Sequence, residues 1–280
     1  MDHTSELKLS IVLSTHQAQF EAVAFKGDLE ANLAKVAGWG YSGVELAIRD
    51  PDLVDGEVLD GLLRRYSLRV PAIGTGQAWG EERLSFTSPD RAVREAAVRR
   101  IKRHLPLAHH LNAFVIIGLI RGVTPPGQSR TESMKFLIGC LQECAEAASV
   151  EGVCLAFEPL NRYETDLVHT VSEGLELIRQ VDANSLGLLL DTFHMNIEEP
   201  DIEESIQRAG ENIYHFHVAD SNRWYPGAGH LDFRKIFKAL YSTGYTSWIS
   251  GEFLPAPNAD SAAELAIKTL TRMLTSENSQ

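Results

Sequence analysis

The sequence is poor in cysteine and has no hydrophobic run long enough to cross a membrane. Its three cysteines are Cys140, Cys144 and Cys154, and no second Cys/His pair completes a zinc-binding pattern. We therefore expect buried thiols of a cytoplasmic protein rather than a redox pair. No apolar stretch approaches the ~18 residues of a membrane span, and the N-terminus lacks the basic region and apolar core of a signal peptide.

Positive charge is also scarce. Lysine and arginine number 26 against 38 aspartate and glutamate residues, a net charge of −12. A nucleic-acid binder needs a basic face, so we expect no nucleic-acid partner. A small anionic substrate remains possible, because a local arginine cluster can lie on an acidic protein. No linker, low-complexity segment or charge block divides the chain, which predicts a single domain over residues 1–280.

Eight apolar stretches alternate with helical segments. The predicted strands cover residues 7–14, 43–46, 69–73, 113–118, 153–157, 186–190, 213–218 and 247–251. The predicted helices cover residues 28–39, 54–66, 88–111, 129–150, 170–181, 202–209, 232–243 and 260–274. An α/β chain of eight such units predicts a single (β/α)8 TIM barrel. A doubly wound open sheet is less favoured, because no glycine-rich dinucleotide loop follows the first strand.

Four strands end on a side chain that commonly binds metal: Glu158, Asp191, His217 and Glu252, spaced 33, 26 and 35 residues apart. Side chains alternate across a strand, so bulky apolar residues are expected to face the helices and these four to point into the barrel. They would then meet at the C-terminal rim, where barrel enzymes keep their active sites.

Each of these residues also has an ordinary interpretation. A glutamate after a strand can be a solvated loop residue, Asp191 can be a helix cap, and Arg223 can lie on the surface. In the seventh predicted strand, His215 and His217 share a face opposite Tyr214 and Phe216. We expect His215 to be packed or hydrogen-bonded rather than a ligand. The four predicted ligands nevertheless all lie at strand ends, on the inward face and at the same rim, and this coincidence favours a metal site.

Three carboxylates and one imidazole suit Mn²⁺ or Mg²⁺ better than a structural zinc ion. Glu158 and Glu252 come from the two ends of the ligand arc, so a substrate on the metal would lie between two carboxylates. This arrangement suits epimerisation. The cation polarises a carbonyl, one carboxylate removes the neighbouring C–H proton, and the other returns a proton to the opposite face of the enediolate. His194 and Arg223 are candidates to bind the developing oxyanion.

The motifs FEPLNRYE, LLDTFHMN, HFHVADSNRWYPGAGHLDF and GEF resemble those of the xylose-isomerase-like sugar epimerase/isomerase superfamily, in particular ketose 3-epimerases of the D-tagatose/D-psicose type. The resemblance implies proton transfer by Glu158 and Glu252 and substrate contacts from Glu164, His194 and Arg223. It implies a divalent metal, Mn²⁺ before Mg²⁺ or Co²⁺, and a homodimer or homotetramer. The implied metal ligands are Glu158, Asp191, His217 and Glu252.

The first half of the chain resembles a narrower bacterial branch that converts 5-keto-L-gluconate to D-tagaturonate. The stretches concerned are AFKGDL, VELAIRDP, AIGTGQAW and VIIGLIRG. A keto-hexuronate needs a cation for its carboxylate, and Arg49, Arg121 and Arg162 follow predicted strands at the expected rim. In the loop 74–88, Trp79 and Phe86 suit either ordinary packing or a lid over the site.

Several functions remain open at this point. The sequence favours a metal-dependent epimerase acting on 5-keto-L-gluconate. The alternatives are a ketose 3-epimerase acting on neutral ketohexoses and an aldose–ketose isomerase of the hydroxypyruvate type, which shifts the proton between adjacent carbons. An endonuclease-IV-like DNA repair nuclease needs a basic face and further histidine ligands, and a sugar-binding barrel would not need two carboxylates beside a metal.

Overall fold

Eight parallel strands form a closed ring. In the computed structural model, β1 (Lys8–Ser14) pairs with β3 (Gly43–Ala47) on one side and with β9 (Trp248–Gly251) on the other, which closes the sheet. Between them lie, in chain order, β4 (Ala72–Gly74), β5 (Phe114–Ile117), β6 (Leu155–Phe157), β7 (Leu186–Asp191) and β8 (Ile213–Val218). A two-residue strand, β2 (Phe25–Lys26), extends the sheet beside β1.

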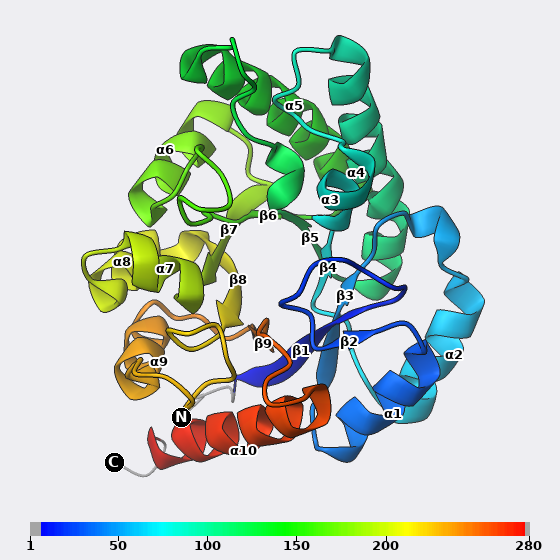
Figure 1. Cartoon of the computed structure of the whole chain (residues 1–280), viewed down its shortest axis with the longest axis vertical. Helices are drawn as coiled ribbons and strands as arrows, with labels where there is room; N and C mark the ends of the chain where they lie inside the picture. The colour runs from blue at the N-terminus through cyan, green and yellow to red at the C-terminus, as the bar shows by residue number, and fades with distance from the viewer. Residues whose placement is uncertain (1–6, 278–280) are drawn as a thin grey trace.

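An outer ring of helices surrounds these strands (Figure 1). The helices that follow the barrel strands are α1 (Leu29–Gly38), α2 (Gly56–Tyr66), α4 (Arg91–Leu111), α5 (Arg130–Glu151), α6 (Val171–Val181), α8 (Ile202–Ala209), α9 (Phe233–Ser242) and α10 (Ala259–Glu277). The predicted (β/α)8 TIM barrel is therefore confirmed. Within the described residues 7–277, no helix combines the length and apolar character needed to cross a bilayer. Residues 1–6, part of the stretch without a signal-peptide pattern, lie outside this range.

Several predicted helix starts are correct because a polar side chain caps the first turn. Asp28, Ser129 and Asp232 each accept a hydrogen bond from the backbone three residues on, and Thr170 forms a complete capping box with Glu173. The predicted start at residue 88 is wrong. Asp90, not Ser88, caps α4, through a 2.8 Å bond from the Ala92 amide to Asp90 Oδ1. Similarly, α2 begins after the cap Asp55 rather than at residue 54.

The third predicted strand is also displaced. The sequence predicts residues 69–73, whereas the ordered strand β4 covers Ala72–Gly74. Arg69 forms only an isolated bridge with Gly43. Pro71 has no backbone N–H to donate, so it interrupts the ladder between Arg69 and β4.

Two apolar layers lie on the two faces of the barrel sheet. The larger packs the outer face against the helices, and a small interior cluster contains Ala72, Ile116, Ala156 and Leu189. This confirms the expected alternation in β6. Tyr214 is an exception: it packs against the interior cluster, because a register shift in the β7–β8 pairing makes it an extra residue. Cys140 and Cys144 are buried thiols as expected, whereas Cys154 is half-buried.

Two segments at the C-terminal rim were not predicted as helices. α3 (Gln77–Glu82) lies inside the expected loop 74–88, and α7 (Thr192–Glu198) follows β7 without a break. Phe86, considered as a lid residue, is fully buried in the core between strands and helices and cannot serve as one. Trp79 is half-buried within α3.

Candidate active site

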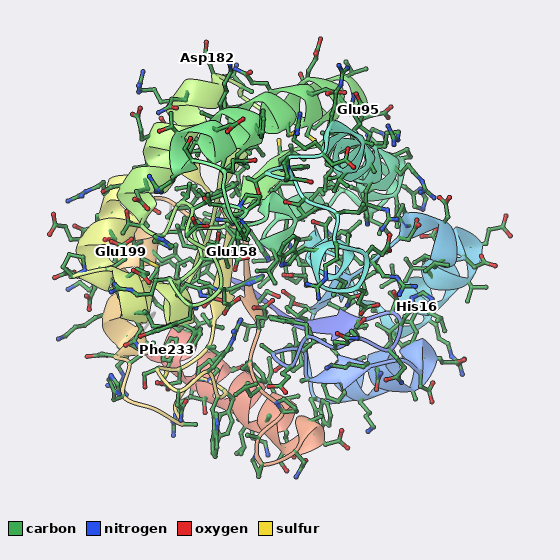
Figure 2. All side chains as sticks on the ribbon, turned by 45° about the horizontal axis from the view of Figure 1, so that its top comes forward. His16, Glu95, Glu158, Asp182, Glu199 and Phe233 are labelled. Atoms are coloured by element: carbon green, nitrogen blue, oxygen red, sulfur yellow. The ribbon has the colours of Figure 1, made fainter. Side chains whose placement is uncertain are left out.

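Four ligand-type side chains converge at the C-terminal ends of four consecutive strands. Glu158, Asp191, His217 and Glu252 each offer one ligand atom, and these atoms all lie within 4.8 Å of one another. In Figure 2, Glu158 lies towards the middle of the barrel, whereas Glu95 and Asp182 lie at its periphery. The structure thus brings together all four residues that the sequence predicted as metal ligands.

The free atoms of this cluster fit a cation. Glu158 Oε1, Asp191 Oδ2 and His217 Nδ1 are buried and have no hydrogen-bond partner. Buried polar atoms are almost always paired, so three unpaired atoms gathered within 4.8 Å of one another fit one shared cation. His217 Nδ1 lies 3.8 Å from Glu158 Oε1 and 3.9 Å from Asp191 Oδ2. Two ligands of one Mg²⁺-sized ion are at most about 4.2 Å apart, so both distances are compatible with a shared cation.

The charges of the cluster support the same conclusion. Burial raises the pKa of Glu158 well above its usual range, and the neighbouring Glu252 carboxylate raises it further. Burial also raises the pKa of Asp191, and that of Glu252 to about 7. These carboxylates therefore lack sufficient positive charge from the protein, which a divalent cation would provide.

Asp191 is both a helix cap and a candidate ligand. Its Oδ1 accepts a 2.7 Å hydrogen bond from the Phe193 amide at the start of α7, as expected of a capping aspartate. Its Oδ2 remains unpaired and faces His217 Nδ1. The two interpretations of this residue are therefore compatible, because each carboxylate oxygen has a separate role.

Arg223 connects the metal cluster with Glu164. Its Nη1 donates to Glu164 Oε1 at 2.7 Å, and its Nη2 lies 3.4 Å from Glu252 Oε2. The guanidinium is held between two rings, with its carbon 5.2 Å from the centroid of Phe20 and 4.7 Å from that of Phe193. Arg223 and Glu164 therefore both lie beside the cluster, as predicted for substrate-binding residues.

His194 is fixed as a neutral donor. Burial, helped by the nearby Arg223, lowers its pKa well below the usual value. Asn161 Oδ1 accepts from the Tyr163 amide, so Asn161 Nδ2 faces His194 Nδ1 at 2.7 Å and donates to it. The proton of the ring then lies on Nε2, which is 3.8 Å from Glu158 Oε1. His194 therefore presents an N–H group to the site.

The loop that carries Arg223 is organised by the fully buried Asp220. Its Oδ1 accepts from the amides of Ser221 and Leu231, and its Oδ2 accepts from that of Gly227. The Arg223 amide donates to the backbone carbonyl of Asp220, and Arg223 has a φ of 60°. This conformation is unfavourable for an arginine, so the surrounding hydrogen bonds must hold it.

A cavity of ≈ 280 Å³ extends from the cluster towards the rim. One end contains Glu158, His217, Glu252 and the groups around Arg223. Apolar side chains complete the lining, among them Phe20 and Val23 from the segment after β1 and Leu119 from the segment after β5. The space suits a small molecule with one polar reacting end.

A family model described as xylose isomerase-like TIM barrel matches residues 33–273. The chain belongs to this family. Among its relatives is an L-ribulose 3-epimerase from Methylomonas sp. (strain DH-1), 30% identical over 239 residues that cover 82% of each chain. Another, an L-ribulose 3-epimerase from Mesorhizobium japonicum, is 31% identical over 86% of this chain and 80% of its own.

Solved structures agree with this assignment. A D-allulose 3-epimerase from Methylomonas sp., crystallised in complex with D-allulose, superposes with a TM-score of 0.81 at 26% identity, covering 96% of this chain and 98% of that one. As a member of the xylose isomerase-like family whose relatives are named epimerases, the chain is a carbohydrate isomerase.

The three rim arginines considered for a substrate carboxylate do not line the cavity of this xylose isomerase-like barrel. Arg121 is fully buried and donates to backbone carbonyls. Arg162 is exposed and pairs with Glu198 at 2.8 Å. Arg49 pairs at 2.6 Å with Glu81, which does line the cavity.

Sequence reasoning missed three residues that shape the site. They are Glu45, Asn161 and Asp220, all at most 1% exposed. A signal existed for Glu45, since a glutamate in the apolar strand GVELA must point away from the helices. Asn161 and Asp220 lie within motifs already noted, but their partners become visible only in the fold.

Proposed function

We propose that this protein is a divalent-metal-dependent epimerase that inverts the carbon next to the ketone of a keto sugar. The observation that carries the proposal is the position of Glu158, which is buried, and Glu252, which is half-buried: both carboxylates belong to one ligand cluster at the end of a sugar-sized cavity. A divalent cation bound by this cluster would supply Lewis-acid polarisation of the sugar carbonyl.

The two carboxylates are placed to move a proton. One removes it from the carbon beside the ketone, and the other delivers a proton to the opposite face. Positioned acid–base groups contribute roughly 10²–10⁴-fold each.

His194 and Arg223 would bind the oxygens of the substrate. The neutral His194 offers its Nε2–H to a developing oxyanion, and Arg223 adds a positive charge while it holds Glu164. Glu164 then orients a hydroxyl group of the sugar. We propose Mn²⁺ as the metal, because three carboxylates and one imidazole suit it, with Mg²⁺ or Co²⁺ as substitutes.

For the substrate we propose a keto-hexuronate, with 5-keto-L-gluconate converted to D-tagaturonate. Support comes from the resemblance of the first half to that branch: Ala47 and residues 74–77 belong to its characteristic stretches and line the cavity. A neutral ketohexose is the second candidate. It is favoured by the named relatives and by the fact that Arg223 is the one arginine lining the cavity within residues 7–277.

The test is incubation with Mn²⁺ in D₂O of 5-keto-L-gluconate, D-allulose, D-tagatose and L-ribulose in parallel. An epimerase incorporates deuterium at the carbon beside the ketone and inverts its configuration. Transfer of the carbonyl along the chain would instead identify an aldose–ketose isomerase. A higher kcat/KM for a neutral ketohexose than for 5-keto-L-gluconate would refute the sugar-acid assignment.

The mechanism is tested by Glu158→Gln and Glu252→Gln. Each variant should lose at least about 10²-fold in kcat while retaining its circular dichroism spectrum. Arg162→Gln is the matched control, because Arg162 lies at the rim but outside the cavity. Near-wild-type turnover by either glutamate variant would refute the two-carboxylate mechanism.

A further inference from the structure

A buried carboxylate lies beneath the metal cluster and belongs to none of the roles described so far. Glu45 is in the middle of β3 and is 1% exposed. Its Oε2 lies 2.7 Å from His215 Nε2 and 2.9 Å from His217 Nε2. β3 and β8 are separated in the barrel by β1 and β9, so these contacts cross the interior.

These two contacts determine where the protons of the histidines lie. An ionised carboxylate only accepts hydrogen bonds, so both Nε2 atoms must carry a proton. A neutral His217 then has its lone pair on Nδ1. That atom is unpaired and lies 3.8 Å from Glu158 Oε1 and 3.9 Å from Asp191 Oδ2. Glu45 thus selects the tautomer that can bind a cation in the cluster.

Glu45, His215 and His217 are themselves close enough to bind a metal. The geometry favours hydrogen bonding instead. Both contacts have hydrogen-bond lengths, and a cation there would need the same His217 Nε2 that donates to Glu45. With its Nδ1 already facing the main cluster, His217 would have to coordinate two ions at once.

We propose that Glu45 is a positioning residue for the metal site. It holds His217 in the Nε2–H form with Nδ1 directed at the cation, and His215 holds the Glu45 carboxylate in place. The same device, a carboxylate behind a metal-bound histidine, raises ligand basicity and fixes ring orientation in other metal sites. The inference rests on His217 being a ligand, which is part of the proposed function.

The experiment measures Mn²⁺ binding to chelator-stripped protein by isothermal titration calorimetry. We expect one site per wild-type chain. Glu45→Ala removes the acceptor and should weaken Mn²⁺ binding 10- to 100-fold, the usual range for such outer partners. Glu45→Gln keeps an acceptor oxygen but removes its charge, so its Mn²⁺ affinity should lie between those of wild type and Glu45→Ala. His215→Gln frees the Glu45 carboxylate on one side only, so this variant should lose less Mn²⁺ affinity than Glu45→Ala.

A second readout reports the tautomer directly. In Mg²⁺-loaded protein, long-range ¹H–¹⁵N spectra should show His217 protonated at Nε2 and coordinated at Nδ1. In Glu45→Gln the signal should broaden or shift towards a tautomer mixture. A structural defect alone would not change the tautomer of one histidine selectively.

The matched control is His104→Gln. His104 is fully buried like His215, but its ring nitrogens contact the backbone carbonyls of Arg100 and Ile48 and lie outside the cavity. We expect this variant to lose thermal stability while its Mn²⁺ affinity stays within about twofold of wild type.

The outcomes separate the two proposals. If wild type binds no divalent cation, the proposed function fails. If wild type binds Mn²⁺ and Glu45→Ala binds it equally well, the role of Glu45 is refuted while the proposed function stands. Two cations per wild-type chain, one of them lost in Glu45→Ala, would make the triad a second metal site and overturn the positioning role.

Discussion

Asn161 holds the orientation of His194 through two N–H groups. Its side-chain Nδ2 donates to His194 Nδ1 at 2.7 Å and its backbone amide donates at 3.4 Å, and both keep the ring proton on Nε2. We predict that Asn161→Ala lowers kcat about fivefold with little change in KM, because the loss of one hydrogen bond is about 1 kcal/mol and acts on the transition state. Steady-state kinetics at saturating Mn²⁺ measures kcat and KM separately.

A double-mutant cycle with His194→Ala provides the control. If Asn161 acts through His194, its removal should have much less effect on kcat once the imidazole is gone. Equal losses in both backgrounds would show that Asn161 supports the loop generally, through its bond to the Tyr163 amide, rather than the histidine.

The residues that sequence could find are those whose role depends on position alone. Glu158, Asp191, His217 and Glu252 follow apolar strands, and parallel strands deliver their ends to one rim. Glu45 could not be assigned in the same way, since its partners lie 170 and 172 residues away. Asp220 was also missed, because its acceptor role depends on the course of a loop.

Among the elements, the ends of β5 and β6 are joined by one buried arginine. Arg121 donates to Gly118 O at 3.0 Å and Ile117 O at 3.2 Å, and it reaches the carbonyls of Leu167 and Val168 at 3.4 Å. Its guanidinium stacks on Phe157 at 3.9 Å. The sequence suggested a substrate-binding arginine, whereas the structure shows a clamp between two rim loops.

We predict that Arg121→Met lowers the free energy of unfolding by at least about 2 kcal/mol, because buried carbonyls lose a charged donor. Arg121→Lys should recover little of this free energy of unfolding, since an ammonium group cannot match the planar hydrogen-bonding fork of the guanidinium. Urea unfolding measures the effect. Arg162→Met is the control on the same rim, and we expect its unfolding midpoint to match that of wild type. Equal midpoints for all variants would exclude the clamp.

The length of an element decides how well sequence predicts it. Long strands and capped helices agree with the structure to within a few residues, because apolar periodicity and caps are local signals. β2 has two residues, and α3 and α7 have six and seven, too few for a period to be visible. These short elements lie at the rim, where tertiary contacts with the cavity override local preference.

At the scale of the whole molecule, the barrel interior has an excess of negative charge at one end. Glu158, Asp191 and Glu252 come together there, with Glu45 beneath them, and Arg223 and Arg121 are the arginines that act on them. Burial lowers the pKa of Arg121 to about 9, so it remains charged at neutral pH. A cation bound by the proposed site would stabilise a fold that gathers acids in this way.

This charge makes the stability of the metal-free protein depend on pH. Burial raises the pKa of Glu252 from 4.5 to about 7 on folding. Between these values the folded state binds more protons than the unfolded state, so the contribution of Glu252 to the free energy of unfolding falls as pH rises from about 4.5 to about 7. Glu252→Gln removes this term, and in EDTA its stability advantage over wild type should therefore grow across that window.

Urea unfolding of both proteins between about pH 5 and about pH 8 measures the difference. The comparison of wild type with one variant cancels groups on which Glu252 does not act, such as His194, whose lowered pKa acts in the opposite direction below pH 6.5. The measured difference therefore combines the titration of Glu252 with its effect on the pKa of Glu158 and His217. Addition of Mn²⁺ should reverse the order at high pH, because wild type binds the ion with a complete ligand set and gains stability by mass action. If the difference in stability is constant with pH in EDTA, Glu252 does not titrate in this range. If Mn²⁺ leaves the difference unchanged, Glu252 does not bind the metal.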